Sequence, residues 1–173
     1  MKRSDMKRSY AIPVSLALLL TLPMVSPHIA GADPGPTLVG YQQTTNYVIQ
    51  RALAQRGVPF LYGGGNAAGP TRGSSALNAN IVGFDASGLI QYAYAGAGVK
   101  MPRTSAEQCN VGRKVTPAQA RPGDLLCYGP GGTQSVAMYL GNNQMIEATE
   151  PAVTITPART NGMLPYLTRI LES

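Results

Sequence analysis

The order of helical and strand patterns predicts an α+β domain in which a central helix packs on an antiparallel sheet. Apolar residues recur at helical spacing in the first part of the chain, and short apolar runs separated by glycine-rich turns follow from Gly123 onward. Helices followed by closely spaced strands are typical of an α+β fold with one sheet. The chain shows no internal repeat, so we expect a single domain of this kind.

The helices are predicted from apolar spacing and from capping residues. A first helix is expected over about 44–55, where apolar residues recur at helical spacing. The central helix is expected over 86–95, because Asp85 is a favourable N-cap and a glycine follows the last turn. A shorter helix is expected to begin at Thr104, which forms a T-x-x-E capping box with Glu107.

Four strands are predicted in the second part of the chain, over 124–128, 135–140, 144–149 and 153–157. The glycine-rich passage 63–83 is interpreted as an ordered loop. It lacks the lysine and the following hydroxyl residue of a phosphate-binding loop, and the Gly-Pro pair within it ends any helix. A nucleotide site is therefore not expected there.

An export signal is predicted over residues 1–32. A basic stretch through Arg8 precedes an apolar run over 11–25, and the small-residue sequence Ala-Gly-Ala ends at position 32. An uncleaved membrane anchor is the alternative, but the run is broken by prolines and is shorter than the roughly 20 apolar residues that span a bilayer. We expect cleavage, a flexible leader over 33–43, no membrane span in the mature chain, and a location in the cell wall or envelope space.

Charge and composition exclude several kinds of function. The chain has 14 lysines and arginines against 8 acidic residues, but four of the basic and one of the acidic residues fall in the predicted signal, which leaves +3. That balance is too weak for a nucleic-acid-binding surface, and the chain has no tryptophan. The one histidine, His28, also precedes the predicted cleavage point. A mature chain without imidazole has no histidine base and no histidine metal ligand, and we expect neither a metal nor a cofactor.

Four ordered motifs resemble the NlpC family of papain-like peptidases, which cut the peptide stems of bacterial peptidoglycan. The motifs are GFDASGLIQYAYAGAGVKMPRTSAEQ, RPGDLLCYGP, SVAMYLGNNQMIEA and VTITPAR. The likeness runs from about Thr44 to Arg169, and the glycine-rich passage is similar to that of the actinobacterial Rip group. It implies a papain-like NlpC-type domain over 44–173.

The same resemblance implies that the catalytic positions have lost their chemistry. The family's cysteine nucleophile, which a helix start holds as a thiolate, corresponds here to Ala86. Its histidine base corresponds to Ser135, and the tyrosine that reaches the cysteine corresponds to Phe60. The polar residue that orients the histidine is retained as Glu147. These replacements resemble the noncatalytic branch of the family typified by RipD.

The residues that bind ligand in the resembling family are partly retained. Asp85 and Ser87 correspond to ligands for the amine end of the stem peptide, and Glu147 and Ser135 are further candidates. Capping of the central helix would by itself also explain an aspartate at position 85. The expected function is binding of peptidoglycan without hydrolysis. Peptide stems are the expected ligand, but the sequence leaves glycan, stem peptide and cross-link open. Two alternatives stay open: a protein-interaction module that regulates active cell-wall hydrolases, and a slow peptidoglycan endopeptidase.

Two cysteines, Cys109 and Cys127, remain in the mature chain. Export to an oxidising compartment permits one disulfide, whereas two separate buried thiols are the alternative. A nucleophilic role is disfavoured, because no histidine is present to make a thiolate. In the resembling family both positions usually hold aromatic residues, so their joint replacement by cysteine favours pairing.

Overall fold

The computed structural model describes residues 38–74 and 80–172. The chain divides into one unit over Met1–Asp33 and a second over Pro34–Ser173, and all described residues belong to the second. The predicted export signal and residues 33–37 of the predicted leader therefore lie outside the described residues. Within the described part, no helix is long and apolar enough to cross a membrane.

Three α-helices precede most of the strands. They are α1 (Leu38–Leu53), α2 (Ala86–Ala95) and α3 (Ser105–Gln108), and two 3-10 turns, η2 (Pro117–Gln119) and η3 (Pro130–Gly132), follow. The strands are β1 (Thr71–Arg72), β2 (Val82–Gly83), β3 (Arg113–Val115), β4 (Leu125–Tyr128), β5 (Ser135–Gly141), β6 (Gln144–Ala148), β7 (Val153–Pro157) and β8 (Leu167–Arg169).

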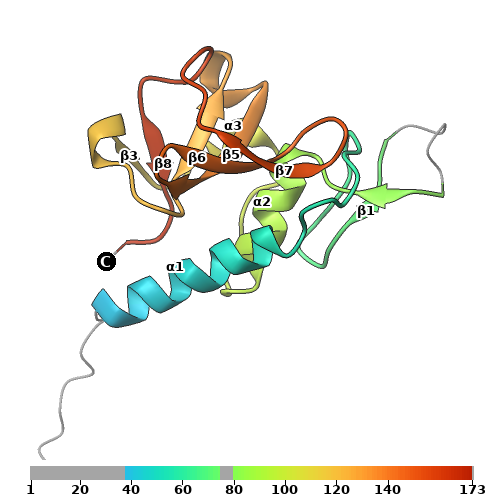
Figure 1. The fold of residues 1–173 in the computed structure, drawn as a ribbon, viewed down its shortest axis with the longest axis horizontal. Helices are drawn as coiled ribbons and strands as arrows, with labels where there is room; N and C mark the ends of the chain where they lie inside the picture. Colours follow the sequence, from blue (N-terminus) through green and yellow to red (C-terminus); the bar gives the residue numbers. More distant parts are fainter. Residues whose placement is uncertain (1–37, 75–79, 173) are drawn as a thin grey trace, which may run out of the picture. The chain divides into compact units, whose positions relative to one another are not determined.

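The strands β3 to β8 form one antiparallel sheet, which confirms the predicted α+β class. Among the described residues its strand order is β3-β8-β4-β5-β6-β7, and β1 and β2 form a separate short ladder. Strands β4 to β7 follow the chain as a meander and were predicted. The last strand, β8, returns to lie between β3 and β4, and Figure 1 shows it beside β3. Neither β3 nor β8 was predicted, because three residues are too few to display an alternating pattern.

The first helix begins earlier than its apolar spacing predicts. It starts at Leu38 rather than near Thr44, so residues 38–43 of the predicted leader are helical. The proline- and glycine-rich composition ends at Pro36, and Gly40 alone costs a helix only about 1 kcal/mol relative to alanine. Packing of the buried side chains Val48 and Ala52 against α2 offsets that cost.

The two faces of the sheet carry separate cores. Alternation along β4 sends Leu125 and Cys127 to the face covered by α1 and α2, and Leu126 and Tyr128 to the opposite face. On the helical face, α2 packs between α1 and the central strands β5 and β6 (Figure 1). The opposite face is covered by loop residues such as Met163. The amino-terminal end of α2 is thus held against the sheet by a fully buried core.

The structure joins Cys109, at the end of α3, to Cys127 of β4 in a disulfide. Both residues are fully buried in the core beneath α2. Neither described cysteine is left as a free thiol. The bridge ties the short helix α3 to the centre of the sheet, and α3 in turn borders the cleft described next.

Candidate functional site

An open cleft of about 650 Å³ lies at the amino-terminal end of α2. It is lined by the segments on both sides of β1, by the start of α2, by the loop and first residue of α3, by the segment that leads from η3 into β5, and by the end of β6 with the residue after it. The described lining residues are Phe60, Tyr62, Gly63, Ser74, Asp85, Ala86, Ser87, Arg103, Thr104, Ser105, Thr133, Gln134, Ser135, Ala148 and Thr149. A volume of this size is in the range that binds small ligands or a segment of a polymer.

Asp85 caps α2 as predicted and also fixes the neighbouring loop. Its backbone is extended, and its Oδ1 accepts a hydrogen bond of 2.6 Å from the backbone N–H of Gly88. Its Oδ2 accepts a second one, of 3.1 Å, from the N–H of Gly63. One carboxylate therefore satisfies an open amide of the helix start and holds the glycine-rich loop against it.

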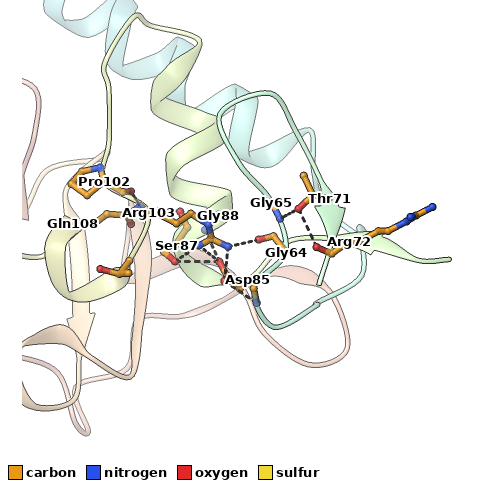
Figure 2. A network of polar contacts seen from close by, with 12 residues as sticks. Gly64, Gly65, Thr71, Arg72, Asp85, Ser87, Gly88, Pro102, Arg103 and Gln108 are labelled. Atoms are coloured by element: carbon orange, nitrogen blue, oxygen red, sulfur yellow. Dashed lines mark hydrogen bonds and ion pairs between the residues drawn. The ribbon is translucent and has the colours of Figure 1, made fainter. Parts of the chain in front are cut away.

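Arg103 lies across the same carboxylate and forms a two-point ion pair with it. Its NH2 is 2.8 Å from Asp85 Oδ2, and its NH1 is 3.0 Å from Asp85 Oδ1. NH1 also donates to Ser87 Oγ at 2.8 Å, and NH2 donates to the carbonyl of Gly64 at 3.0 Å. Figure 2 shows the guanidinium placed between the start of α2 and the glycine-rich loop. Four of its five N–H groups are thus used inside the protein.

Two features bring Arg103 into this position. Gly88 allows the loop to approach α2, because a Cβ at Gly88 would lie only 2.2 Å from the carbonyl oxygen of Gly64. The fully buried Gln108 of α3 donates to the carbonyls of Ser87 at 2.9 Å and of Pro102 at 2.8 Å. These bonds tie the segment before α3 to α2, so the arginine enters the cleft with a fixed backbone.

The structure brings together three of the positions that the resemblance relates to catalysis. Ala86 is the first residue of α2, Ser135 is the first residue of β5, and Phe60 lies on the loop before β1. All three line the cleft and are partly exposed there. The predicted ligand residues Asp85 and Ser87 line it as well. These three side chains offer a methyl, a hydroxyl and a phenyl group to the cleft.

Glu147 is the predicted ligand residue that the structure does not bring to the cleft. Its side chain is 2% exposed and lies on β6, facing the sheet surface away from the helices. Arg159 pairs with both of its oxygens, at 2.7 Å from NH2 to Oε2, and Thr156 donates to Oε1 at 2.8 Å. The hydrogen bonds from Arg159 to Glu147 raise the pKa of Arg159. The Glu147 carboxylate is buried and paired with Arg159, so the structure does not support direct contact between Glu147 and a ligand.

Ser135 and Glu147 nevertheless lie on the same face of the sheet. The register pairs Met138 of β5 with Ile146 of β6, so Ala137 stands opposite Glu147. Ser135 is two positions from Ala137 and shares its face. A longer side chain at 135 would be a diagonal neighbour of Glu147.

Several residues of the cleft were not singled out from the sequence, and Arg103 and Tyr62 are the two with the largest side chains. Arg103 is one isolated basic residue, and only its place just before a capping box that faces an acidic N-cap could have identified it. Tyr62 directly precedes the glycine-rich passage 63–83, in a stretch without periodicity, and it is 78% exposed at the cleft. Long-range packing of three loops determines both placements, and no local pattern records it.

No group of three or more histidine, cysteine, aspartate or glutamate side chains able to hold a metal occurs in the described part of the chain. The charged lining residues that the structure describes, Asp85 and Arg103, neutralise each other. The cleft is therefore a neutral surface, rich in hydroxyl and amide groups, suited to binding a polar ligand.

Comparison with known proteins identifies related sequences and folds. Residues 57–172 match the NlpC/P60 family. Peptidoglycan endopeptidase RipB from Mycobacterium tuberculosis is 54% identical over 133 residues, which are 76% of this chain and 55% of RipB. Peptidoglycan endopeptidase RipA from the same organism is 48% identical over 147 residues, which are 83% of this chain and 31% of RipA. The chain thus spans about half of one relative and a third of the other.

Solved structures are similar over the same region. RipD from Mycobacterium tuberculosis, described as a non-catalytic NlpC/p60 domain protein with an adaptation to peptidoglycan-binding function, is 62% identical with a TM-score of 0.71, covering 76% of this chain and all of that one. RipB from the same organism is 51% identical with a TM-score of 0.75, covering 79% of this chain and 69% of that one. The papain-like α+β fold is shared with these structures, residues 57–172 match the family model, and the chain belongs to the NlpC/P60 family.

Proposed function

We propose that this chain is an exported, noncatalytic NlpC/P60 domain that binds bacterial peptidoglycan without hydrolysing it. The observation that carries the proposal is the chemistry of the cleft, in which Ala86 occupies the start of α2. A helix start can stabilise a thiolate, but a methyl group has no atom that can attack a carbonyl. Ser135 and Phe60 beside it add neither an imidazole nor a phenol.

The spacing of these positions supports the proposal. Three solved structures of RipA are mutated at a cysteine, a histidine or a glutamate, and those residues lie 49 and 12 positions apart in RipA. Ala86, Ser135 and Glu147 are separated by the same 49 and 12 positions in this chain. We infer that alanine and serine replace the cysteine and the histidine here, and that the glutamate is retained.

A replacement nucleophile is also poorly supported. Ser135 has no base strong enough at neutral pH, because Glu147 is enclosed by Arg159 and Thr156. Ser87 donates to Asp85 and accepts from Arg103, so its hydroxyl is already used within the protein. The high identity to RipD, which is described as non-catalytic, supports the same conclusion.

A slow peptidoglycan endopeptidase is the second candidate, and the names of the curated relatives RipA and RipB favour it. A third candidate is a module that regulates active cell-wall hydrolases. RipA is described as a resuscitation promoting factor interacting protein, which shows that a relative can bind a protein partner. Binding to protein-free peptidoglycan separates the first proposal from the third, and release of cleaved products separates it from the second.

An extracytoplasmic location follows from the proposed ligand. Peptidoglycan lies outside the cytoplasm, and the predicted signal over residues 1–32 provides a route of export. We propose that cleavage after Ala32 releases the domain into the envelope space, with no cofactor required for binding. Mass determination of the secreted protein tests the cleavage point.

Co-sedimentation of the mature protein with purified, protein-free sacculi tests the binding proposal. We expect the protein in the pellet, and we expect Ser135→Arg, which places a long side chain in the cleft, to shift it to the supernatant. The matched control is Arg113→Ala on β3, whose side chain pairs with Glu172 and does not line the cleft. Ser87→Ala provides a second, smaller cleft change. Protein that stays in the supernatant, or equal effects of cleft and control changes, would contradict binding through the cleft.

A further inference from the structure

Tyr62 is held with its ring in solvent at the edge of the cleft. The side chain is 78% exposed and lines the cleft, although the adjacent Leu61 is buried at 6%. The backbone on both sides is fixed: the carbonyl of Tyr62 accepts from the N–H of Ser74 at 2.8 Å, and the N–H of Leu61 donates to Phe84 at 3.0 Å. A single exposed aromatic residue is ordinary on a protein surface. An exposed ring on a fixed backbone beside a binding cleft is instead a preformed apolar platform.

Most of the hydrogen-bonding capacity of the charged groups in the cleft is used within the protein, although the Arg103 side chain is 36% exposed. The carboxylate of Asp85 accepts from Gly63, Gly88, Ser87 and twice from Arg103, so its lone pairs are all in use. Arg103 has four N–H groups bonded within the protein. A ligand ammonium or carboxylate would have to break this cluster to find an opposite charge, and its desolvation would go uncompensated.

The groups that remain available are neutral. The side chains of Ser105, Gln134, Ser135 and Thr149 line the cleft and form no hydrogen bond with other residues in the part of the chain that the structure describes. Hydroxyl and carboxamide groups both donate and accept, so they match a ligand that carries hydroxyl and acetamido groups. The cleft therefore combines an apolar platform at its edge with uncommitted neutral hydrogen-bonding groups inside.

We propose that the cleft binds the glycan strand of peptidoglycan, with one pyranose ring of an N-acetylated amino sugar stacked on Tyr62. The proposal rests on the wall-binding function above and names the element that is bound. A pyranose ring presents a face of C–H groups to an aromatic ring and leaves its hydroxyl and acetamido groups free to form hydrogen bonds with neutral cleft groups such as those of Gln134 and Ser135. The peptide stem, whose amine and carboxylates need opposite charges, fits the Asp85–Arg103 cluster less well.

Calorimetric titration of the mature protein with N-acetylglucosamine hexamer tests the proposal directly. We expect binding that Tyr62→Ala weakens about tenfold and that Tyr62→Phe leaves nearly unchanged, because the ring face and not the hydroxyl makes the contact. Tyr47→Ala is the matched control, since Tyr47 is 49% exposed on α1 and does not line the cleft. The affinity should be almost independent of salt, because screening acts on charges and the sugar is neutral.

Competition with sacculi distinguishes failure of this proposal from failure of the binding function. We expect the hexamer to displace the protein from sacculi and a glycan-free stem peptide to leave it bound. No binding of the hexamer, or equal affinity of Tyr62→Ala and the unmodified protein, overturns the glycan assignment. If sacculi still retain the protein in that case, wall binding stands and the stem peptide becomes the ligand. If sacculi do not retain it, the binding function fails as well.

Discussion

Arg103 and Asp85 form a two-point ion pair at the start of α2, with distances of 2.8 Å from NH2 to Oδ2 and 3.0 Å from NH1 to Oδ1. The same carboxylate caps the helix through Gly88. Asp85 thus has two roles. It caps α2, which the sequence predicts, and it pairs with Arg103, which depends on the position of the loop before α3. The two roles can be separated by substitution.

Asp85→Ala should lower the free energy of unfolding by about 1–2 kcal/mol, because it removes the cap. Asp85→Asn should cost less, since asparagine caps as well as aspartate and a partly exposed ion pair contributes about 1 kcal/mol or less. Urea denaturation of the three proteins measures the difference. Equal losses for the alanine and asparagine variants would show that the ion pair with Arg103, and not the cap, is the main contribution.

The free energy of unfolding should fall when the pH rises above about 10, because the pKa of Tyr94 is higher in the folded chain than in the unfolded chain. Burial raises the pKa of Tyr94 well above its ordinary value, and its hydroxyl donates to the carbonyl of Gly123. The unfolded chain loses this proton near pH 10, whereas the folded chain keeps it. The stabilisation is therefore present below pH 10 and is lost progressively above it.

Tyr94→Phe is the variant that tests this dependence. It should cost about 1 kcal/mol at neutral pH through the lost hydrogen bond, and it should lose less stability than the unmodified protein between pH 10 and 12. Some alkaline loss should remain, because burial also raises the pKa of Tyr128. Identical alkaline slopes for the two proteins would exclude Tyr94 as the titrating group.

The bond between Cys109 and Cys127 is expected to form after export. The 18-residue separation corresponds to a contribution of about 3 kcal/mol if the bridge is unstrained. Thiol counting on secreted, denatured and unreduced protein should find no free thiol, and reduction should lower the melting temperature. Two free thiols per chain would exclude the bridge in the secreted protein.

Local signals predicted more of the fold than of the cleft. The cap at Asp85, the capping box at Thr104 and the strands of the meander follow from short-range patterns, and the structure confirms them. Strand β8 and the pairing of Glu147 with Arg159 depend on segments that meet only in the folded chain. The sequence identifies Glu147 as a carboxylate, but its pairing with Arg159, which only the folded chain shows, determines whether it can contact a ligand.

Rebuilding the catalytic groups should restore some hydrolysis if the cleft has kept the geometry of its active relatives. Ala86→Cys alone should stay nearly inert, because it adds a sulfur at a helix start without a base. Adding Ser135→His supplies an imidazole on the same face of the sheet as Glu147. Oε2 of Glu147 accepts one hydrogen bond in the structure, from Arg159. Adding Phe60→Tyr should give a further increase. Chromatography of released muropeptides measures each step.

The control for this series is Ser135→His alone, which has a base and no nucleophile and should remain inactive. The rate of the triple variant should stay below that of RipB, since small errors in the position of reacting groups are costly. A folded triple variant that sediments with sacculi and releases nothing would show that the cleft geometry differs from that of the active relatives.

Binding without hydrolysis is tested by measuring the release of soluble muropeptides from protein-free sacculi by the unmodified mature protein. The protein is first shown to sediment with the sacculi, and the same sample is then incubated for a long period beside a RipB sample as the active control. A noncatalytic domain should release no more than a protein-free blank, with the protein still in the pellet. Time-dependent release above the blank, abolished by Ser135→Arg, would contradict this expectation and identify the chain as an endopeptidase.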